Sequence, residues 1–166
     1  EDAQEQFTDA LEQLSTLIAF DGGELQDTYE ALKDQYESSK NSAERVESRI
    51  DSIENVAEAL FDEWEDELEQ YSNESLRRSS EKQLKNTQRR YQRLIKAMRK
   101  AESSMQPVLA TLNDNVLYLK HNLNASAIGA LQGELEQIQK EIKTLISEMN
   151  SSIAQSEDFI NLLNQN

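Results

Sequence analysis

The sequence predicts an all-α protein: an elongated, antiparallel, coiled-coil-like bundle of three long helices plus a shorter N-terminal helix. Apolar residues recur at steps of three and four over long stretches, which is the period of one helix face. The 166 residues include only four Gly and one Pro, too few for the many turns of a sheet protein. An acidic run at residues 54–69 precedes a basic run at residues 77–100, a pattern that favours two helices folded back on each other.

The first two helices are predicted at about residues 1–20 and 24–71. The first carries Phe7, Ala10, Leu14 and Leu17 at helical spacing and ends at the glycine pair 22–23, since glycine adopts the left-handed conformation at no steric cost. The second has the most regular apolar seam of the chain. This seam comprises Leu25, Tyr29, Leu32, Tyr36, Ser39, Ala43, Val46, Ile50, Ile53, Ala57, Leu60 and Trp64.

A reversal is predicted at residues 72–75, because the seam cannot be carried in phase from Tyr71 to Leu76 and because Ser72, Asn73 and Ser75 are cap-forming residues. The pairing then places residue 66 near residue 80 and residue 58 near residue 88. The alternative is one continuous helix from residue 24 to residue 120, which leaves the acidic and basic runs unpaired within the chain.

The third and fourth helices are predicted at about residues 75–121 and 125–164. Pro107 lies inside the third, and we expect a kink there and not an end, because the apolar seam keeps its phase on both sides. Asn124 is the expected N-cap of the fourth helix. The four helices form a single domain over residues 1–166. The first is too short to cover the others, so the half of the bundle near residues 60–90 should have three helices and an uncovered groove.

The composition excludes several classes of function. With 17 basic and 32 acidic residues the net charge is −15, which opposes binding to nucleic acid and to anionic lipid at long range. There is no cysteine for a disulfide, a thiolate metal site or a thiol nucleophile, and a di-iron site of the four-helix type needs two histidines where the chain has only His121. We therefore expect no catalytic residues, no metal and no cofactor.

Two surfaces are candidates for binding. One is a basic face on the third helix, formed by Arg89, Arg90, Arg93, Lys96, Arg99 and Lys100. It suits an acidic partner or an anionic lipid or ligand, although pairing with the acidic second helix would also account for it. The other is an exposed seam or groove at the far end of the second helix, formed by Trp64, Leu68 and Tyr71.

Four short segments resemble one bacterial family, the domain of unknown function 2959 family. They read ALFDEWEDEL at residues 59–68, LRR at 76–78, YQRLI at 91–95 and LKHNLNA at 119–125. The resemblance covers most of the chain and implies a proteobacterial envelope protein on the periplasmic side. It also implies an N-terminal signal or lipoprotein segment, which here would lie before Glu1. It implies no catalytic residue, substrate or cofactor.

Together these observations predict a non-enzymatic structural or protein-interaction bundle of the bacterial envelope that associates with itself or with another protein. Binding of anionic lipid or ligand through the basic face at residues 89–100 is the alternative. No run of the sequence approaches the roughly 20 apolar residues of a membrane span, so we expect membrane association at most through a segment before Glu1.

Overall fold

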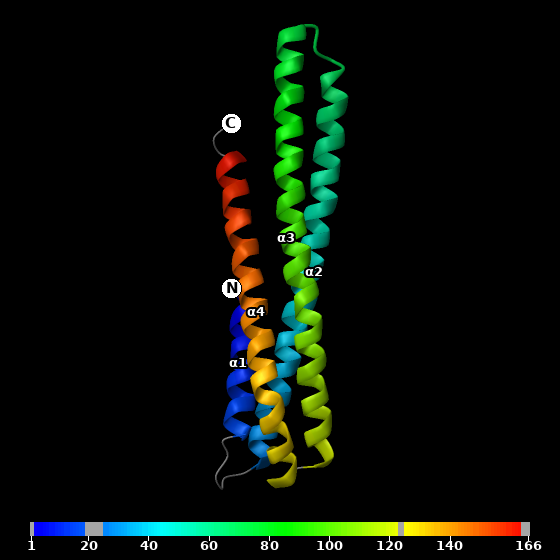
Figure 1. Ribbon diagram of the computed structural model, residues 1–166. Helices are drawn as coiled ribbons and strands as arrows, with labels where there is room; N and C mark the ends of the chain where they lie inside the picture. Colours follow the sequence, from blue (N-terminus) through cyan, green and yellow to red (C-terminus); the bar gives the residue numbers. More distant parts are fainter. Residues whose placement is uncertain (1, 19–24, 123–124, 164–166) are drawn as a thin grey trace.

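Four helices follow one another along the chain, each antiparallel to the one before it (Figure 1). The computed structural model describes residues 2–18, 25–122 and 125–163. Its helices are α1 (Asp2–Ile18), α2 (Leu25–Leu68), α3 (Glu74–His121) and α4 (Ala125–Leu163), and the described residues contain no strand. The predicted all-α class, the order of the helices and the short first helix are confirmed. At 1.5 Å per residue α3 is roughly 70 Å long.

The helices pack as a ring in which α1 contacts α2 and α4, and α3 contacts the same two helices from the other side. Figure 1 shows that α1 covers only the end of the bundle at which α2 and α4 begin and α3 ends. Above α1, α4 continues beside α3, and the α2–α3 hairpin extends beyond both. The bundle therefore changes from four helices to three and then to two along its length.

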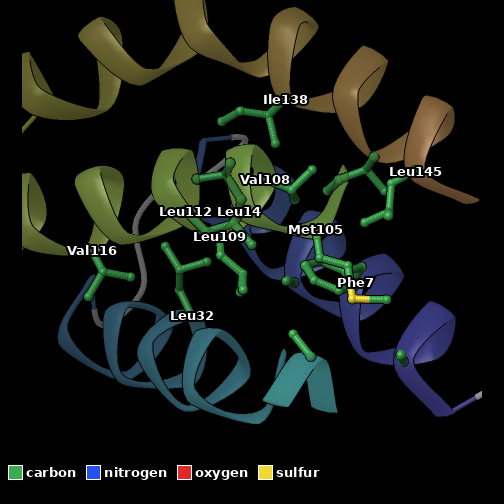
Figure 2. Close-up of a cluster of buried hydrophobic side chains, with 14 of the residues drawn as sticks. Phe7, Leu14, Leu32, Met105, Val108, Leu109, Leu112, Val116, Ile138 and Leu145 are labelled. Atoms are coloured by element: carbon green, nitrogen blue, oxygen red, sulfur yellow. The ribbon is translucent and has the colours of Figure 1, made fainter. Parts of the chain in front are cut away.

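The main core lies in the four-helix end. Side chains from all four helices converge there, as Figure 2 shows for Phe7 and Leu14 of α1, Leu32 of α2, Leu112 of α3 and Leu145 of α4. All five are fully buried. Burying a side chain of this size contributes about 1.5–3 kcal/mol relative to leaving it exposed, so this cluster holds α1 in place although a 17-residue helix is marginal alone.

The turn between α2 and α3 is capped by side-chain and backbone hydrogen bonds. Asn73 Oδ1 accepts hydrogen bonds from the backbone N–H of Ser75 and Leu76, at 2.9 and 3.2 Å. This confirms the predicted reversal. The prediction that the second helix extends to residue 71 is wrong: α2 ends at Leu68, and the N–H of Gln70 bonds back to the Glu67 carbonyl at 3.0 Å, three residues away, which tightens the last turn.

α3 continues through Pro107, and Val108 and Leu109 beside it are buried in the core. This confirms the prediction that the helix does not end at the proline. Packing of the apolar seam on both sides of Pro107 offsets the lost backbone hydrogen bond. The predicted turn at residues 22–23 and the predicted cap at residue 124 lie outside the described residues.

The far end of the bundle has two helices among the described residues, not the three that were expected. Near its end α4 contacts the hairpin through the rings of Phe159 and Tyr91, whose centroids are 6.4 Å apart. α4 ends at Leu163, whereas α3 begins at Glu74. The last stretch of the hairpin, roughly 20 Å long, is formed by α2 and α3 alone. The fourth helix is shorter than its neighbours and begins level with the end of α3, so it cannot reach the tip.

The helix register was predicted only approximately. Trp64 Nε1–H donates to Ser80 Oγ at 2.8 Å, close to the expected pairing. Residue 88 was expected beside residue 58, but Gln88 bonds Glu65, about two turns nearer the tip. The rings of Phe61 and Tyr91 pack edge to face, with centroids 5.4 Å apart. Such a ring pair contributes about 0.5–1.5 kcal/mol beyond its buried area, and a single exposed ion pair about 0.2–1 kcal/mol, so aromatic packing contributes to the register along with the ion pairs of Arg99.

Candidate interaction surface

An apolar groove opens where α1 begins, between α2 and α4, and we call it the α2–α4 groove. It starts beside Ala3 and has a volume of about 430 Å³. Val46, Ile50 and Ile53 line it from α2, Met98 and Met105 from α3, and Met149 and Ile153 from α4. These residues lie along the path on which α1 would continue, so the groove has the shape and the apolar lining of a site for one more helix.

The apolar surface continues along α2 beyond the groove. Val56 is 69% exposed and Leu60 is 49% exposed, and both follow Ile53 at helical spacing. Ile160, near the end of α4, is also exposed. Single exposed apolar residues are common, but a contiguous row beside a groove is typical of an interaction surface.

Charged residues stand at both ends of this row on the same face of α2. Arg45 and Arg49 line the α2–α4 groove at one end. Glu63 and Glu67 are exposed at the other end. Within the described residues none of these four side chains forms an ion pair, and Arg45 bonds only Ser42 Oγ, at 2.6 Å. Unpaired arginines beside an apolar groove, in a chain of net charge −15, favour a partner with acidic side chains.

The predicted basic face divides into paired and unpaired residues. Arg99 bonds three carboxylates: Asp51 at 2.5 Å, Glu102 at 2.8 Å, and Glu54. The bonds to Glu54, Glu102 and Asp51 raise the pKa of the Arg99 guanidinium. Arg99 is the one basic residue that joins α3 to α2 by ion pairs in the described part of the chain, so the expected pairing of the acidic and basic runs is realised only there.

The other residues of the basic face form no ion pair with α2 in the described part of the chain. Lys100 Nζ pairs with Glu148 of α4 at 3.1 Å. Arg89, Arg93 and Lys96 are exposed, Arg90 is half-buried, and among the described residues none of these four forms an ion pair. Arg93, Lys96 and Lys100 line a shallow recess of about 350 Å³ between α3 and α4.

The predicted seam at Trp64, Leu68 and Tyr71 is only partly open. Trp64 is half-buried against Ser80, to which it donates its hydrogen bond, and Leu68 is also half-buried. Tyr71 is exposed but lies beyond the end of α2. The open apolar row lies earlier on α2, at the seam residues Ile53 and Leu60 and at Val56 beside them. The sequence held a signal for it, because Val56 beside the seam residues 53, 57 and 60 makes the apolar stripe wider than one neighbouring helix covers.

Removing the Arg99 side chain should weaken the attachment of α2 to α3. Arg99→Ala leaves three carboxylates facing one another without a cation, and we expect the free energy of unfolding to fall by about 1–2 kcal/mol. Arg93→Ala is the matched control on the same helix and should change it by less than about 0.5 kcal/mol. Urea unfolding of both variants measures this difference. Equal effects would mean that Arg99 does not join the two helices.

Glu148 makes part of the stability depend on pH. A hydrogen bond from Ser104 and pairing with Lys100 lower its pKa below the ordinary value of 4.5, although burial opposes this. The folded state thus binds this proton less readily than the unfolded state. The contribution of Glu148 is present above pH 4.5 and is lost as the pH falls through the lower folded-state pKa.

Glu148→Gln should therefore lower stability by about 1 kcal/mol at pH 7 and by much less at pH 3. Chemical denaturation of the parent chain and the variant at both pH values gives the two differences. A difference that stays constant between pH 7 and pH 3 would contradict a role for the ionised carboxylate.

The described residues contain neither a metal-binding cluster nor a membrane-spanning helix. No group of three or more His, Asp or Glu side chains is placed to hold a metal ion within residues 2–18, 25–122 and 125–163. None of the helices, over the same residues, combines the length and the apolar character that crossing a membrane needs.

The comparisons with known proteins agree with the resemblance found in the sequence. Residues 1–163 match a family described as protein of unknown function (DUF2959). No curated protein and no solved structure matches the chain. The family match spans nearly the whole chain and all four helices, and the chain therefore belongs to the DUF2959 family.

Proposed function

We propose that the protein is a non-enzymatic structural or interaction bundle of the bacterial envelope, and that it works by receiving a helix of another protein molecule in the α2–α4 groove. The observation that carries this proposal is the groove itself. Its apolar lining from three helices and its continuation along Ile53, Val56 and Leu60 leave a helix-sized face without a neighbour among the described residues. Burial of such a face is the main favourable term in association.

The chemistry of the groove indicates what kind of helix it accepts. Its floor is apolar, while Arg45 and Arg49 stand at its edge without ion pairs in the described part of the chain. An amphipathic helix with apolar residues at steps of three and four and with acidic residues beside them fits both features. The envelope location is supported by the family resemblance alone.

Site-specific photocrosslinking in cells tests this function. A photoreactive amino acid at Ile53, in the full-length protein expressed from its own gene, should crosslink to another protein molecule. The same amino acid at Ser103, which is exposed on α3 and does not line the groove, should give none of that product. A partner crosslinked equally from both positions, or from neither, would contradict a role for the groove.

Binding of anionic lipid headgroups is a second candidate. It is favoured by Arg93 and Lys96, which line a recess between α3 and α4 and have no ion pair among the described residues. Flotation with anionic vesicles at low salt should retain the protein, and Arg93→Glu with Lys96→Glu should abolish retention while Lys82→Glu should not. Absence of the parent protein from anionic vesicles at low salt would rule this candidate out, because attraction to an anionic surface is least screened there. The net charge of −15 already opposes such binding.

A further inference from the structure

Resting on the proposed function, we propose that the helix received in the groove is α2 of a second copy of this chain. The two α2 helices would run antiparallel, related by a two-fold axis near Val56. In this arrangement the far part of each α2, which carries Leu60, Glu63 and Glu67, lies along the arginine edge of the groove of the other copy. Such an interface is isologous, because the same residues of both copies form it.

One face of α2 carries a charge pattern that is complementary to itself. Seven exposed residues follow one another at steps of three or four, and we call them the α2 stripe: Arg45, Arg49, Ile53, Val56, Leu60, Glu63 and Glu67. The stripe is basic at one end, apolar in the middle and acidic at the other end. Reversing the direction of the helix therefore places basic residues against acidic ones.

The spacing within the α2 stripe is symmetric about Val56. Arg49 and Glu63 each lie seven residues from Val56, and Arg45 and Glu67 each lie eleven residues from it. Ile53 and Leu60 lie three and four residues away on opposite sides. An antiparallel pair centred on Val56 thus sets Arg49 against Glu63 of the second copy, Arg45 against Glu67, and the apolar residues against each other. Four ion pairs flank one apolar centre.

The length of the free surface matches this pairing. With the axis at Val56, Leu68, where α2 ends, lies level with residue 44 of the other copy. Ser42 lines the groove there beside Ala3, close to the first residue of α1. The far part of α2 therefore lies along the path beyond α1 and ends where α1 begins. The acidic far end of one copy is brought to Arg45 and Arg49, which line the groove of the other.

The four-helix end also explains why the pairing is limited to this segment. Below Ser42 the same side of α2 is covered by α1, where Gln35 Nε2 bonds Gln6 and Ser39 Oγ bonds the Gln6 carbonyl at 3.1 Å. A helix from a second copy cannot bind there. The stripe begins immediately after this covered part, so α1 limits the extent of the proposed dimer, while the charge pairs about Val56 set its register.

Charge reversal followed by mixing tests the proposal on the full chain. Sedimentation velocity should show a dimer for the parent protein at micromolar concentration. Arg45→Glu with Arg49→Glu should shift it to a monomer, and Glu63→Arg with Glu67→Arg should do the same, because each variant brings like charges together. An equimolar mixture of the two variants should recover a dimer, since every facing pair then has opposite charges.

A control variant, Lys82→Glu with Lys143→Glu, makes the same change in net charge as the arginine variant, at exposed positions outside the stripe, and should stay a dimer. A parent protein that sediments as a monomer, or variants that do not dimerise when mixed, would overturn the pairing through α2. If Ile53 then still crosslinks to a different protein in cells, the proposed function stands and only the second copy is excluded. If Ile53 crosslinks only within its own chain, both proposals are wrong.

Discussion

Replacing Phe7 with alanine is expected to lower the free energy of unfolding by about 3–5 kcal/mol, the largest effect of any single substitution on α1. Phe7 is fully buried and belongs to the cluster in which α1 meets the other helices. Alanine would remove most of its apolar contacts and leave a cavity in the core of the four-helix end. A helix of this length does not persist alone in water, so α1 should detach at low denaturant.

Urea unfolding followed by circular dichroism, at one fixed protein concentration, measures this loss. Glu12→Ala is the matched control, because Glu12 is exposed on the same helix and its change should stay within about 0.5 kcal/mol. A loss below 1 kcal/mol for Phe7→Ala would mean that α1 does not pack on the core as described.

Leu112→Ala is the second substitution with a large expected effect, a loss of about 2–5 kcal/mol. Leu112 is fully buried at the centre of the four-helix end, where Figure 2 shows it among Leu14, Leu109 and Val108. Leu117 lies five residues further along α3 and is 54% exposed. The same truncation at Leu117 should cost less than about 1 kcal/mol, since little apolar area is lost from contact.

Leu112→Ala and Leu117→Ala are the same substitution in one helix. Differences in side-chain type and in helix propensity therefore do not enter the comparison, and burial alone distinguishes the two positions. Thermal or urea unfolding under identical conditions gives the two differences. Similar losses at both positions would show that α3 is rotated about its axis relative to the arrangement described here.

Most of the fold could be predicted because helix spacing is a local property of the sequence. The apolar spacing predicted that Phe7, Leu14 and Leu32 face inward, and all three are fully buried. The cap at Asn73 and the continuation of α3 through Pro107 follow from residues within one turn of the feature they determine. Such features need no knowledge of which helices become neighbours.

The errors concern contacts between helices. The two charge runs suggested that bases and acids pair across the hairpin, but Arg77, Arg78 and Lys85 pair with acids of their own helix. Pairs at i and i+4 form at little entropic cost, so they compete well with pairs between helices. The rings of Phe61 and Tyr91 also contribute to the register, and the sequence alone does not say which aromatic residues meet.

The candidate surface was predicted only in part, because it too depends on which helices become neighbours. The sequence predicted an uncovered groove near residues 60–90 because the first helix is short, whereas the α2–α4 groove lies closer to the start of α1, beside residues 42–53 of α2. The sequence placed the exposed residues at Trp64, Leu68 and Tyr71, on the seam itself. The exposed row consists of the seam residues Ile53 and Leu60 together with Val56 beside the seam, whereas Trp64 turns toward Ser80 of α3 and is half-buried.

The central claim is that the α2 stripe is where two copies of the chain meet, and a single engineered cysteine at Val56 tests it most directly. The chain has no cysteine, so Val56→Cys can bridge only to itself across the proposed axis, where the Cα atoms must approach within about 7 Å. Under mild oxidation at micromolar concentration we predict a disulfide-linked dimer for Val56→Cys and no disulfide-linked dimer for Ser103→Cys. Equal crosslinking at both positions, or none at Val56, would contradict the claim.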